Sequence, residues 1–370
     1  MTKDSINLFK PITVGDYTLG HRIAMAPLTR ERANREHIPT EKAVEYYSQR
    51  ASYPGTLIVT EGTFMSTRSG GFKHIPGIYT EAQIDAWKPI FKAIHDAGSR
   101  VFVQIWVIGR AAHPEVLRAE GNDFIGPSGG RPVPGVEEIP RAMTKEEIKG
   151  FVQEYVQAAK NAIAAGADGV EIHNANAYLL DQFLHEDTNQ RTDEYGGSIE
   201  NRARFSLEVV DAVVDAIGAG KVAIRLSPWG LSRNDFTYGI SPISQFSYLI
   251  EQLEKRGREG KRLAYLSLVE PRVHGSRDVE DAAGSNAFVE PIWSGVLMKA
   301  GTLADVAKQV AQQDDRTLVA LGRYFISNPD IVKRIENDWP LTPYDRSTFY
   351  TAGMEGYIDF PFYDEKHKTL

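Results

Sequence analysis

The sequence contains no cysteine. Disulfides, iron–sulfur clusters, cysteine-ligated zinc sites and cysteine nucleophiles all require thiols or thiolates, so all four are excluded. An excess of positive charge is also missing, because 42 Lys and Arg residues stand against 49 Asp and Glu residues, for a net charge of −7. Binding to nucleic-acid phosphates requires clustered positive charge, and we therefore expect no nucleic-acid partner.

Long apolar runs are absent as well. No stretch approaches the about 20 apolar residues that a membrane-spanning helix needs, and residues 1–11 lack the apolar core of a signal peptide. We expect a cytoplasmic protein, monomeric or homodimeric, without a membrane partner. With 42% hydrophobic and 25% charged residues, the composition is that of an ordinary globular protein.

The sequence also lacks a P-loop and the Gly-rich turn of dinucleotide-binding folds, which disfavours an open doubly wound sheet, the main alternative fold. Short β-branched runs instead alternate with longer amphipathic stretches, a pattern typical of β–α units. The predicted strands are Arg22–Leu28, Thr56–Gly62, Arg100–Val107, Gly169–Ala175, Lys221–Pro228, Leu263–Glu270, Gly295–Gly301 and Thr317–Tyr324. The predicted helices are Glu41–Ala51, Glu81–Ala97, Lys145–Ala165, Ile199–Ile217, Pro242–Arg258, Asn286–Trp293, Leu303–Gln313 and Pro329–Asp338.

Eight such units predict an α/β fold, a (β/α)8 TIM barrel, which typically needs about 250 residues. We interpret residues 1–370 as a single barrel domain with insertions at 111–141, 181–197 and 272–290. Each insertion follows a strand, so we expect all three at the C-terminal face, where such barrels keep their active sites. Residues 12–19 predict a hairpin that caps the bottom of the barrel.

Polar residues and glycines at strand ends are the candidates for function. Gly301 and Gly322 end the seventh and eighth strands, and Arg323 follows. Either glycine alone would indicate only a turn. Together with the arginine, at the end of the barrel where phosphate sites are usual, they predict a phosphate-binding site.

A second constellation follows the fourth strand. His173 and Asn176 each offer a neutral hydrogen-bond donor that could converge on a carbonyl oxygen and stabilise negative charge there. Tyr178 is a phenol, protonated at neutral pH, that could supply a proton. A lone histidine is more often structural, so the spacing by itself is suggestive and no more.

Several stretches closely resemble the old yellow enzyme family of flavin-dependent ene-reductases, and the resemblance extends from about Leu8 to Pro361. Within the family, threonine at position 29 indicates the branch without cysteine there, similar to 12-oxophytodienoate reductases and fungal old yellow enzymes. The stretches that carry the resemblance are Ala26–Arg30, Gln104–Trp106, His173–Phe183, Asn189–Phe205, Arg225–Pro228, Gly322–Pro329 and Gly356–Pro361.

The resemblance implies that the barrel mouth holds FMN non-covalently. Thr29 would then bond a flavin carbonyl, and Gln104 and Arg225 would hold the pyrimidine edge, with Arg225 stabilising negative charge on reduced flavin. The full set of implied cofactor-binding residues is Pro27, Thr29, Gly62, Gln104, Arg225, Gly301, Gly322 and Arg323, the last three at the phosphate; no metal is implied.

The resemblance also implies a reaction. NADPH would reduce the flavin and leave, and an α,β-unsaturated carbonyl compound would take its place and receive a hydride at its β-carbon. His173 and Asn176 would bind the substrate carbonyl, and Tyr178 would protonate the α-carbon. The remaining implied substrate-binding residues are Trp106, Phe72 and Tyr357, for each of which ordinary core packing is a serious alternative.

Two departures from the family pattern concern the proton donor. Residue 177 is Ala where Gly is usual, so a positive φ there would be strained, and residue 174 is Asn where a smaller residue is common. Two alternative functions remain open besides the ene-reductase. One is a flavoprotein that catalyses a redox-neutral isomerisation or cyclisation, and the other is a flavin-free binding barrel.

Overall fold

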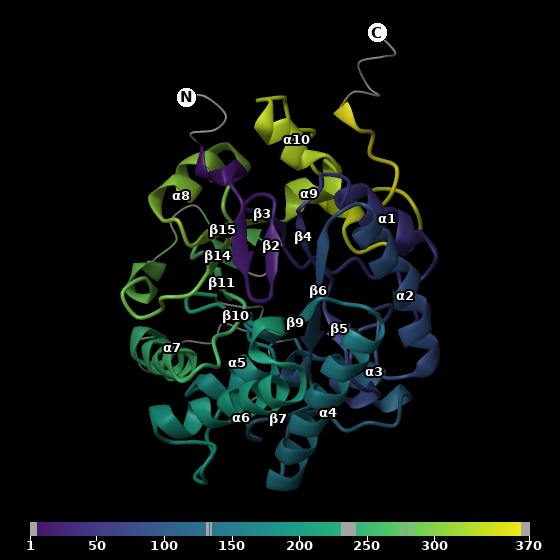
Figure 1. The fold of residues 1–370 in the computed structure, drawn as a ribbon. Coiled ribbons are helices and arrows are strands. Elements are labelled where there is room, and N and C mark those ends of the chain that lie inside the picture. The colour runs from purple at the N-terminus through teal and green to yellow at the C-terminus, as the bar shows by residue number, and fades with distance from the viewer. Residues whose placement is uncertain are drawn as a thin grey trace.

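Eight parallel strands form a closed barrel, which confirms the predicted fold class. The structure, a computed structural model, describes residues 6–363 except 131, 132, 134, 231–241, 275, 276, 280, 281 and 283. The strand order is β4-β3-β15-β14-β11-β10-β9-β6, and β6 closes the ring on β4 (Figure 1). The strands are β3 (Ile23–Met25), β4 (Leu57–Val59), β6 (Arg100–Trp106), β9 (Gly169–Asn174), β10 (Val222–Leu226), β11 (Leu266–Val269), β14 (Leu297–Ala300) and β15 (Thr317–Leu321).

Helices surround the barrel. Two of these helices begin with a capping box: Thr80 and Gln83 bond reciprocally at the start of one helix, and Thr144 and Glu147 at the start of another. The helices that correspond to predicted ones are α1 (Lys42–Arg50), α2 (Glu81–Asp96), α4 (Lys145–Ala164), α6 (Ile199–Ile217), α7 (Pro242–Arg258), α8 (Ala307–Gln313) and α10 (Ile331–Glu336). In the described part of the chain, no helix is both long and apolar enough to cross a bilayer.

In the described part of the chain, sequence periodicity missed three helices of five or six residues, because so short a helix shows less than two turns of pattern. They are α3 (Pro114–Ala119), α5 (Leu179–Leu184) and α9 (Arg323–Ser327). The equally short α10 was predicted only as part of a longer helical range, Pro329–Asp338. The helix predicted over 286–293 was wrong in type, since Asn286–Val289 forms a 3-10 turn. The insertion 111–141 contains the unpredicted helix α3, for which Pro114 at the first helical position was the available signal.

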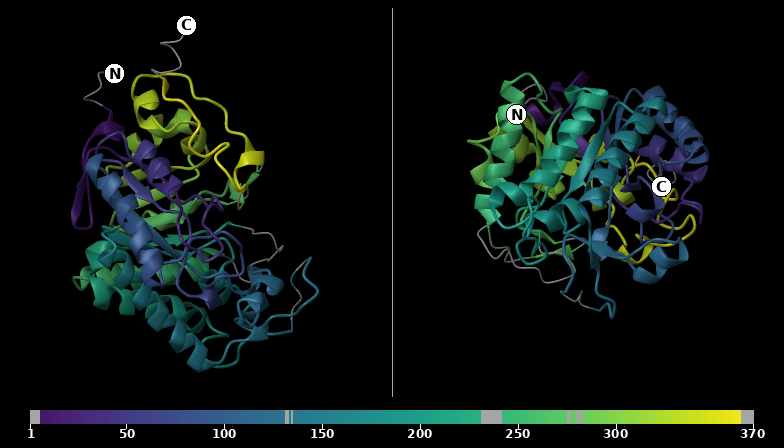
Figure 2. Two further views of the ribbon diagram at one scale, coloured as in Figure 1. Left: turned by 90° about the vertical axis from the view of Figure 1, so that its right-hand side faces the viewer. Right: turned by 90° about the horizontal axis from the view of Figure 1, so that it is seen from below.

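The bottom of the barrel is sealed by the predicted hairpin, β1 (Ile12–Val14) and β2 (Tyr17–Leu19). Val14 and Leu19 are 1% exposed and belong to the apolar cluster inside the barrel. The Tyr17 hydroxyl donates to the carbonyl of Asp168, which precedes β9, at 3.1 Å. The hairpin therefore lies at the amino ends of the strands, opposite the mouth (Figure 2).

Side chains alternate along each strand. In β6, Val101 and Val103 pack outward in the cluster shared with the helices, whereas Phe102 packs in the apolar cluster inside the barrel. The next inward positions along β6 are Gln104 and Trp106, nearer the mouth. The barrel interior is therefore apolar near the hairpin and polar near the mouth.

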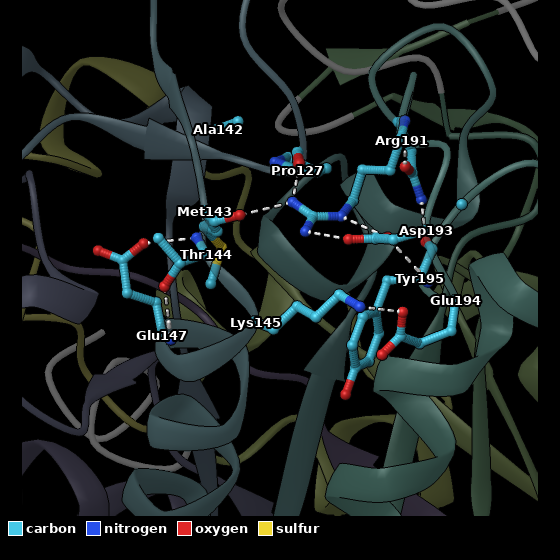
Figure 3. Close-up of polar contacts among 12 residues, drawn as sticks. Pro127, Ala142, Met143, Thr144, Lys145, Glu147, Arg191, Asp193, Glu194 and Tyr195 are labelled. Atoms are coloured by element: carbon cyan, nitrogen blue, oxygen red, sulfur yellow. Dashed lines mark hydrogen bonds and ion pairs between the residues drawn. The ribbon is translucent and has the colours of Figure 1, made fainter.

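Two insertions are tied together at the mouth by Arg191 (Figure 3). Its guanidinium donates to the carbonyls of Pro127 at 2.7 Å and Met143 at 2.6 Å, and it pairs with Asp193. The stretch 181–197 thereby holds the stretch 111–141 in place. The third expected insertion, 272–290, lies partly outside the described residues.

Candidate active site

Three aromatic rings meet at the mouth. The Trp106 ring at the end of β6 is stacked with the His173 imidazole at 5.8 Å between centroids, and Tyr178 meets both rings edge-on at 4.7 and 5.0 Å. Phe72 extends the cluster through Trp106 at 5.9 Å. The structure therefore brings together four of the residues that the sequence singled out.

Buried polar atoms in this cluster have no partner among the described residues. They are the Nδ1 atom of His173, the Oδ1 atom of Asn176 and the Nε1 atom of Trp106. A buried polar atom without a hydrogen bond costs about 1 to 3 kcal/mol and is uncommon in native proteins. Such atoms side by side at a barrel mouth are what a ligand-binding site requires.

The His173 imidazole is electrically neutral at pH 7. Burial lowers its pKa well below the ordinary value, and the nearby positive charge of Arg225 lowers it further. A neutral imidazole carries one N–H group, which can donate a hydrogen bond to a carbonyl oxygen. This agrees with the neutral donor expected from the sequence.

The turn between His173 and Tyr178 is strained. Asn176 and Ala177 have φ angles of +58° and +56°, so the positive φ that the sequence raised for residue 177 is present. The Ala177 amide donates to the Asp181 carboxylate at 2.7 Å, and the Gln182 amide donates to the Ala177 carbonyl at 2.7 Å. These bonds from α5 hold the strained backbone that precedes Tyr178.

Asn174, the second residue at which the sequence departs from the family pattern, points away from the mouth. Its side chain is fully buried and donates to the Ser206 hydroxyl on α6 at 2.9 Å. Asn174 therefore packs between the barrel and α6.

Gln104 and Arg225 lie inside the upper barrel. Both are buried, at 3% and 8% exposed. The Gln104 amide nitrogen donates to Glu171 at 2.8 Å, and Arg225 donates to the Ser267 hydroxyl at 3.4 Å. The sequence analysis did not single out Glu171, although a carboxyl between Val170 and Ile172 in a buried strand was a visible signal.

Glycine at position 62 is explained by close packing. A Cβ atom there would lie 2.4 Å from the Trp106 ring. Pro27 and Thr29 are half-buried in the segment that follows β3. All three residues lie beyond the carboxyl ends of their strands, on the same side as Trp106.

The predicted phosphate site is a cluster of arginines. Arg323, the first residue of α9, pairs with both carboxylate oxygens of Asp278, which also pairs with Arg272 and Arg346. Arg272 in turn donates to the carbonyl of Gly301. Three guanidinium groups around one carboxylate leave an excess of two positive charges, which suits a phosphate dianion.

Glycines make room at this cluster. Gly301 has a φ of +101°, and a Cβ atom there would lie 2.5 Å from Val273. Gly322 immediately precedes α9, so the first backbone amides of that helix lie close to Arg323. Arg272, Asp278 and Arg346 were not predicted, because they are distant from Arg323 in the sequence and belong to no local motif.

Tyr357 is placed differently from the other aromatic candidates. Its ring is 1% exposed and stacks on Tyr46 at 4.2 Å, with the guanidinium groups of Arg30 and Arg32 over it. Arg30 donates to the carbonyl of Gly356 at 2.7 Å. These contacts explain why the Tyr357 ring is buried.

The polar groups fit FMN. A buried glutamine, whose amide nitrogen is engaged by Glu171, and a buried cation suit the pyrimidine edge of a flavin, and the arginine cluster suits its phosphate. In the described residues, no group of three or more metal-ligating side chains lies close enough to hold a metal ion.

Comparison with known proteins agrees with this site. The family model described as "NADH:flavin oxidoreductase / NADH oxidase family" matches residues 7–342. The chain is 48% identical to enoate reductase 1 of Kluyveromyces lactis, covering 97% of this chain and 94% of the relative, and 44% identical to a probable NADPH dehydrogenase of Candida albicans, covering 99% and 93%.

A solved structure shows the same fold. The old yellow enzyme of Pichia sp. superposes with a TM-score of 0.90 at 42% identity, covering 98% of this chain and 95% of the other. These matches confirm the resemblance to the old yellow enzymes. The chain belongs to the NADH:flavin oxidoreductase / NADH oxidase family.

Proposed function

We propose that the protein is an NADPH-dependent, FMN-containing ene-reductase that reduces the activated C=C bond of α,β-unsaturated carbonyl compounds. The observation that carries this proposal is the neutral, buried His173 with an unpartnered nitrogen beside Tyr178. Family membership supports the flavin. The names of the relatives in Kluyveromyces lactis and Candida albicans support the substrate class and the reductant.

The cofactor-binding residues divide between two ends of the site. Arg323, with the backbone at Gly301 and Gly322, would hold the phosphate of FMN. When bound, FMN would take up a hydride from NADPH and release it to the substrate. The residues toward the flavin ring would be Pro27, Thr29, Gly62, Gln104 and Arg225.

The substrate-binding residues would polarise the C=C bond. His173 and Asn176 would donate hydrogen bonds to the carbonyl oxygen, so that negative charge moves onto that oxygen as the β-carbon is reduced. Tyr178 would then donate its phenolic proton to the α-carbon. Trp106 and Phe72 would form an apolar wall of the pocket, since their rings adjoin His173 and Tyr178.

A two-step anaerobic experiment tests the proposal. Purified protein loaded with FMN is first mixed with NADPH, and we expect the flavin absorbance to bleach. Addition of cyclohexenone should then restore the absorbance. Protein that cannot be loaded with FMN would contradict any flavin chemistry, and bleaching without reoxidation by the enone would favour the redox-neutral alternative.

A further inference from the structure

The most unusual polar group inside the barrel is the carboxyl of Glu171. The residue lies in β9 and is 0% exposed. The Gln104 amide donates to one carboxyl oxygen at 2.8 Å, and the Tyr265 hydroxyl donates to the other at 2.9 Å. Tyr265 belongs to the apolar cluster inside the barrel, so Glu171 sits where the apolar interior meets the polar mouth.

The bond to Glu171 fixes the orientation of the Gln104 side chain. A primary amide has donor hydrogens on nitrogen and acceptor lone pairs on oxygen. Because the nitrogen is engaged by Glu171, the Oε1 atom of Gln104 is left as an acceptor. Without the carboxyl, nothing in these contacts would keep the amide from turning over and presenting a donor instead.

The charge of Glu171 acts on Arg225. β9 and β10 are neighbours, with Glu171 paired to Ala223 and His173 paired to Arg225. Burial raises the pKa of Glu171 and Arg225 lowers it, while burial lowers the pKa of Arg225 and Glu171 raises it. A buried cation is costly unless an opposite charge compensates it. Within the described part of the chain, no carboxylate lies within ion-pair distance of Arg225, so Glu171 supplies its compensation from nearby.

We propose that Glu171 is a positioning residue of the flavin site, which orients Gln104 and partly offsets the positive charge of Arg225, and so keeps the reduction potential of bound FMN low. This inference rests on the proposed function, because it assigns FMN to the site that contains Gln104 and Arg225. Reduction adds negative charge to the flavin, and Arg225 favours that charge. A carboxylate beside Arg225 weakens this preference and makes the reduced cofactor a stronger hydride donor.

The test compares the isosteric variant Glu171→Gln with the wild type. Each protein is loaded with FMN, the dissociation constant is measured by titration of flavin fluorescence, and the reduction potential is measured by equilibration with a reference dye. We expect Glu171→Gln to favour reduced over oxidised FMN at least tenfold more than the wild type does, a rise of about 30 mV or more for a two-electron couple. An unchanged potential in a folded, loaded variant would overturn the proposal.

Two further variants separate charge from orientation. Glu171→Asp retains the charge but shortens the side chain, so it should weaken FMN binding several-fold and move the potential much less than Glu171→Gln. Ser267→Ala removes a neutral contact of Arg225 and serves as the control, with little change in potential. A shift in Ser267→Ala as large as in Glu171→Gln would show that packing, not charge, sets the potential.

If Glu171→Gln does not fold, Tyr265→Phe replaces it. Loss of the phenol removes one donor to the carboxylate and favours the neutral carboxyl, so the potential should rise in the same direction by a smaller amount. A fall or no change would contradict the proposal. Failure of the wild type to bind FMN would instead refute the proposed function, which keeps the two outcomes apart.

Discussion

The two ends of the barrel each contain a buried histidine, and the two side chains differ in whether their ring nitrogens have hydrogen-bond partners. His21, at the bottom, has both ring nitrogens engaged, by the Thr56 hydroxyl at 3.0 Å and the Ile23 amide at 3.1 Å. His173, at the mouth, is also buried and has an Nδ1 atom without a partner in the described residues. Burial lowers the pKa of both side chains. The same residue type is therefore structural where its bonds are complete and available to a ligand where they are not.

The two ends of the barrel also differ in how firmly other groups are held. At the bottom, the Asp168 carboxylate accepts bonds from His95, Arg100 and the amide of Val101. At the mouth, two successive residues hold positive φ angles in front of Tyr178. The strained residues Asn176 and Ala177 thus stand at the mouth, where binding and chemistry require groups in fixed positions.

The largest effect should follow from removal of the free imidazole. We expect His173→Ala to slow reduction of cyclohexenone by about 10²- to 10³-fold, equivalent to about 3 to 4 kcal/mol, because one hydrogen bond to the developing oxyanion is lost. Single-turnover reoxidation of reduced enzyme measures this. His21→Ala serves as the matched control, since it should lower stability and leave the turnover of folded enzyme nearly unchanged. Similar losses of turnover in the two variants would contradict the distinction between a structural His21 and a substrate-binding His173.

The next effect is the pH dependence of stability caused by His21. Burial lowers its pKa to about 4 in the folded protein, against 6.5 in the unfolded chain. The unfolded chain therefore binds a proton first, and stability should fall by about 3 kcal/mol as the pH drops from 6.5 to about 4. Denaturant unfolding at several pH values measures this loss. In His21→Gln the loss should shrink by about that amount, and an identical pH profile in both proteins would contradict the assignment.

The smallest effect concerns the strained turn. Ala177→Gly should raise the free energy of unfolding by about 1 kcal/mol, because glycine adopts a positive φ without steric cost. Ala175→Gly, two residues away and without a positive φ, should lower it instead. Chemical denaturation of both variants provides the comparison. Stabilisation by both substitutions, or by neither, would show that the φ angle of residue 177 does not carry the strain.

Periodic patterns predicted most of the fold. Helices α6 and α7 have the predicted bounds, because an amphipathic stripe over 17 or more residues indicates clearly where a helix begins and ends. The strands are apolar runs in the sequence because both of their faces are covered. Helices α5 and α9 were not predicted, since neither is long enough to show two turns of a helical pattern. At the mouth, strand-end residues such as His173 were predictable from chain position alone.

Contacts between distant segments were not predictable. The clustering of Arg272, Arg323 and Arg346 around Asp278 depends on how three separate segments of the chain approach one another. The packing of Tyr357 on Tyr46 depends on the path of the C-terminal segment, which no local pattern specifies. The pairing of Glu171 with Gln104 depends on the register between β6 and β9.

The central claim is that the groups gathered at the mouth serve the reaction with the substrate, and Tyr178→Phe tests it most directly. Wild type and variant are loaded with FMN, reduced anaerobically with NADPH, and mixed rapidly with cyclohexenone while flavin absorbance is followed. We predict nearly unchanged flavin reduction by NADPH and reoxidation by the enone slowed by about 10²-fold or more, because only the second step needs the phenolic proton. Equal loss in both steps, or loss in neither, would contradict the account.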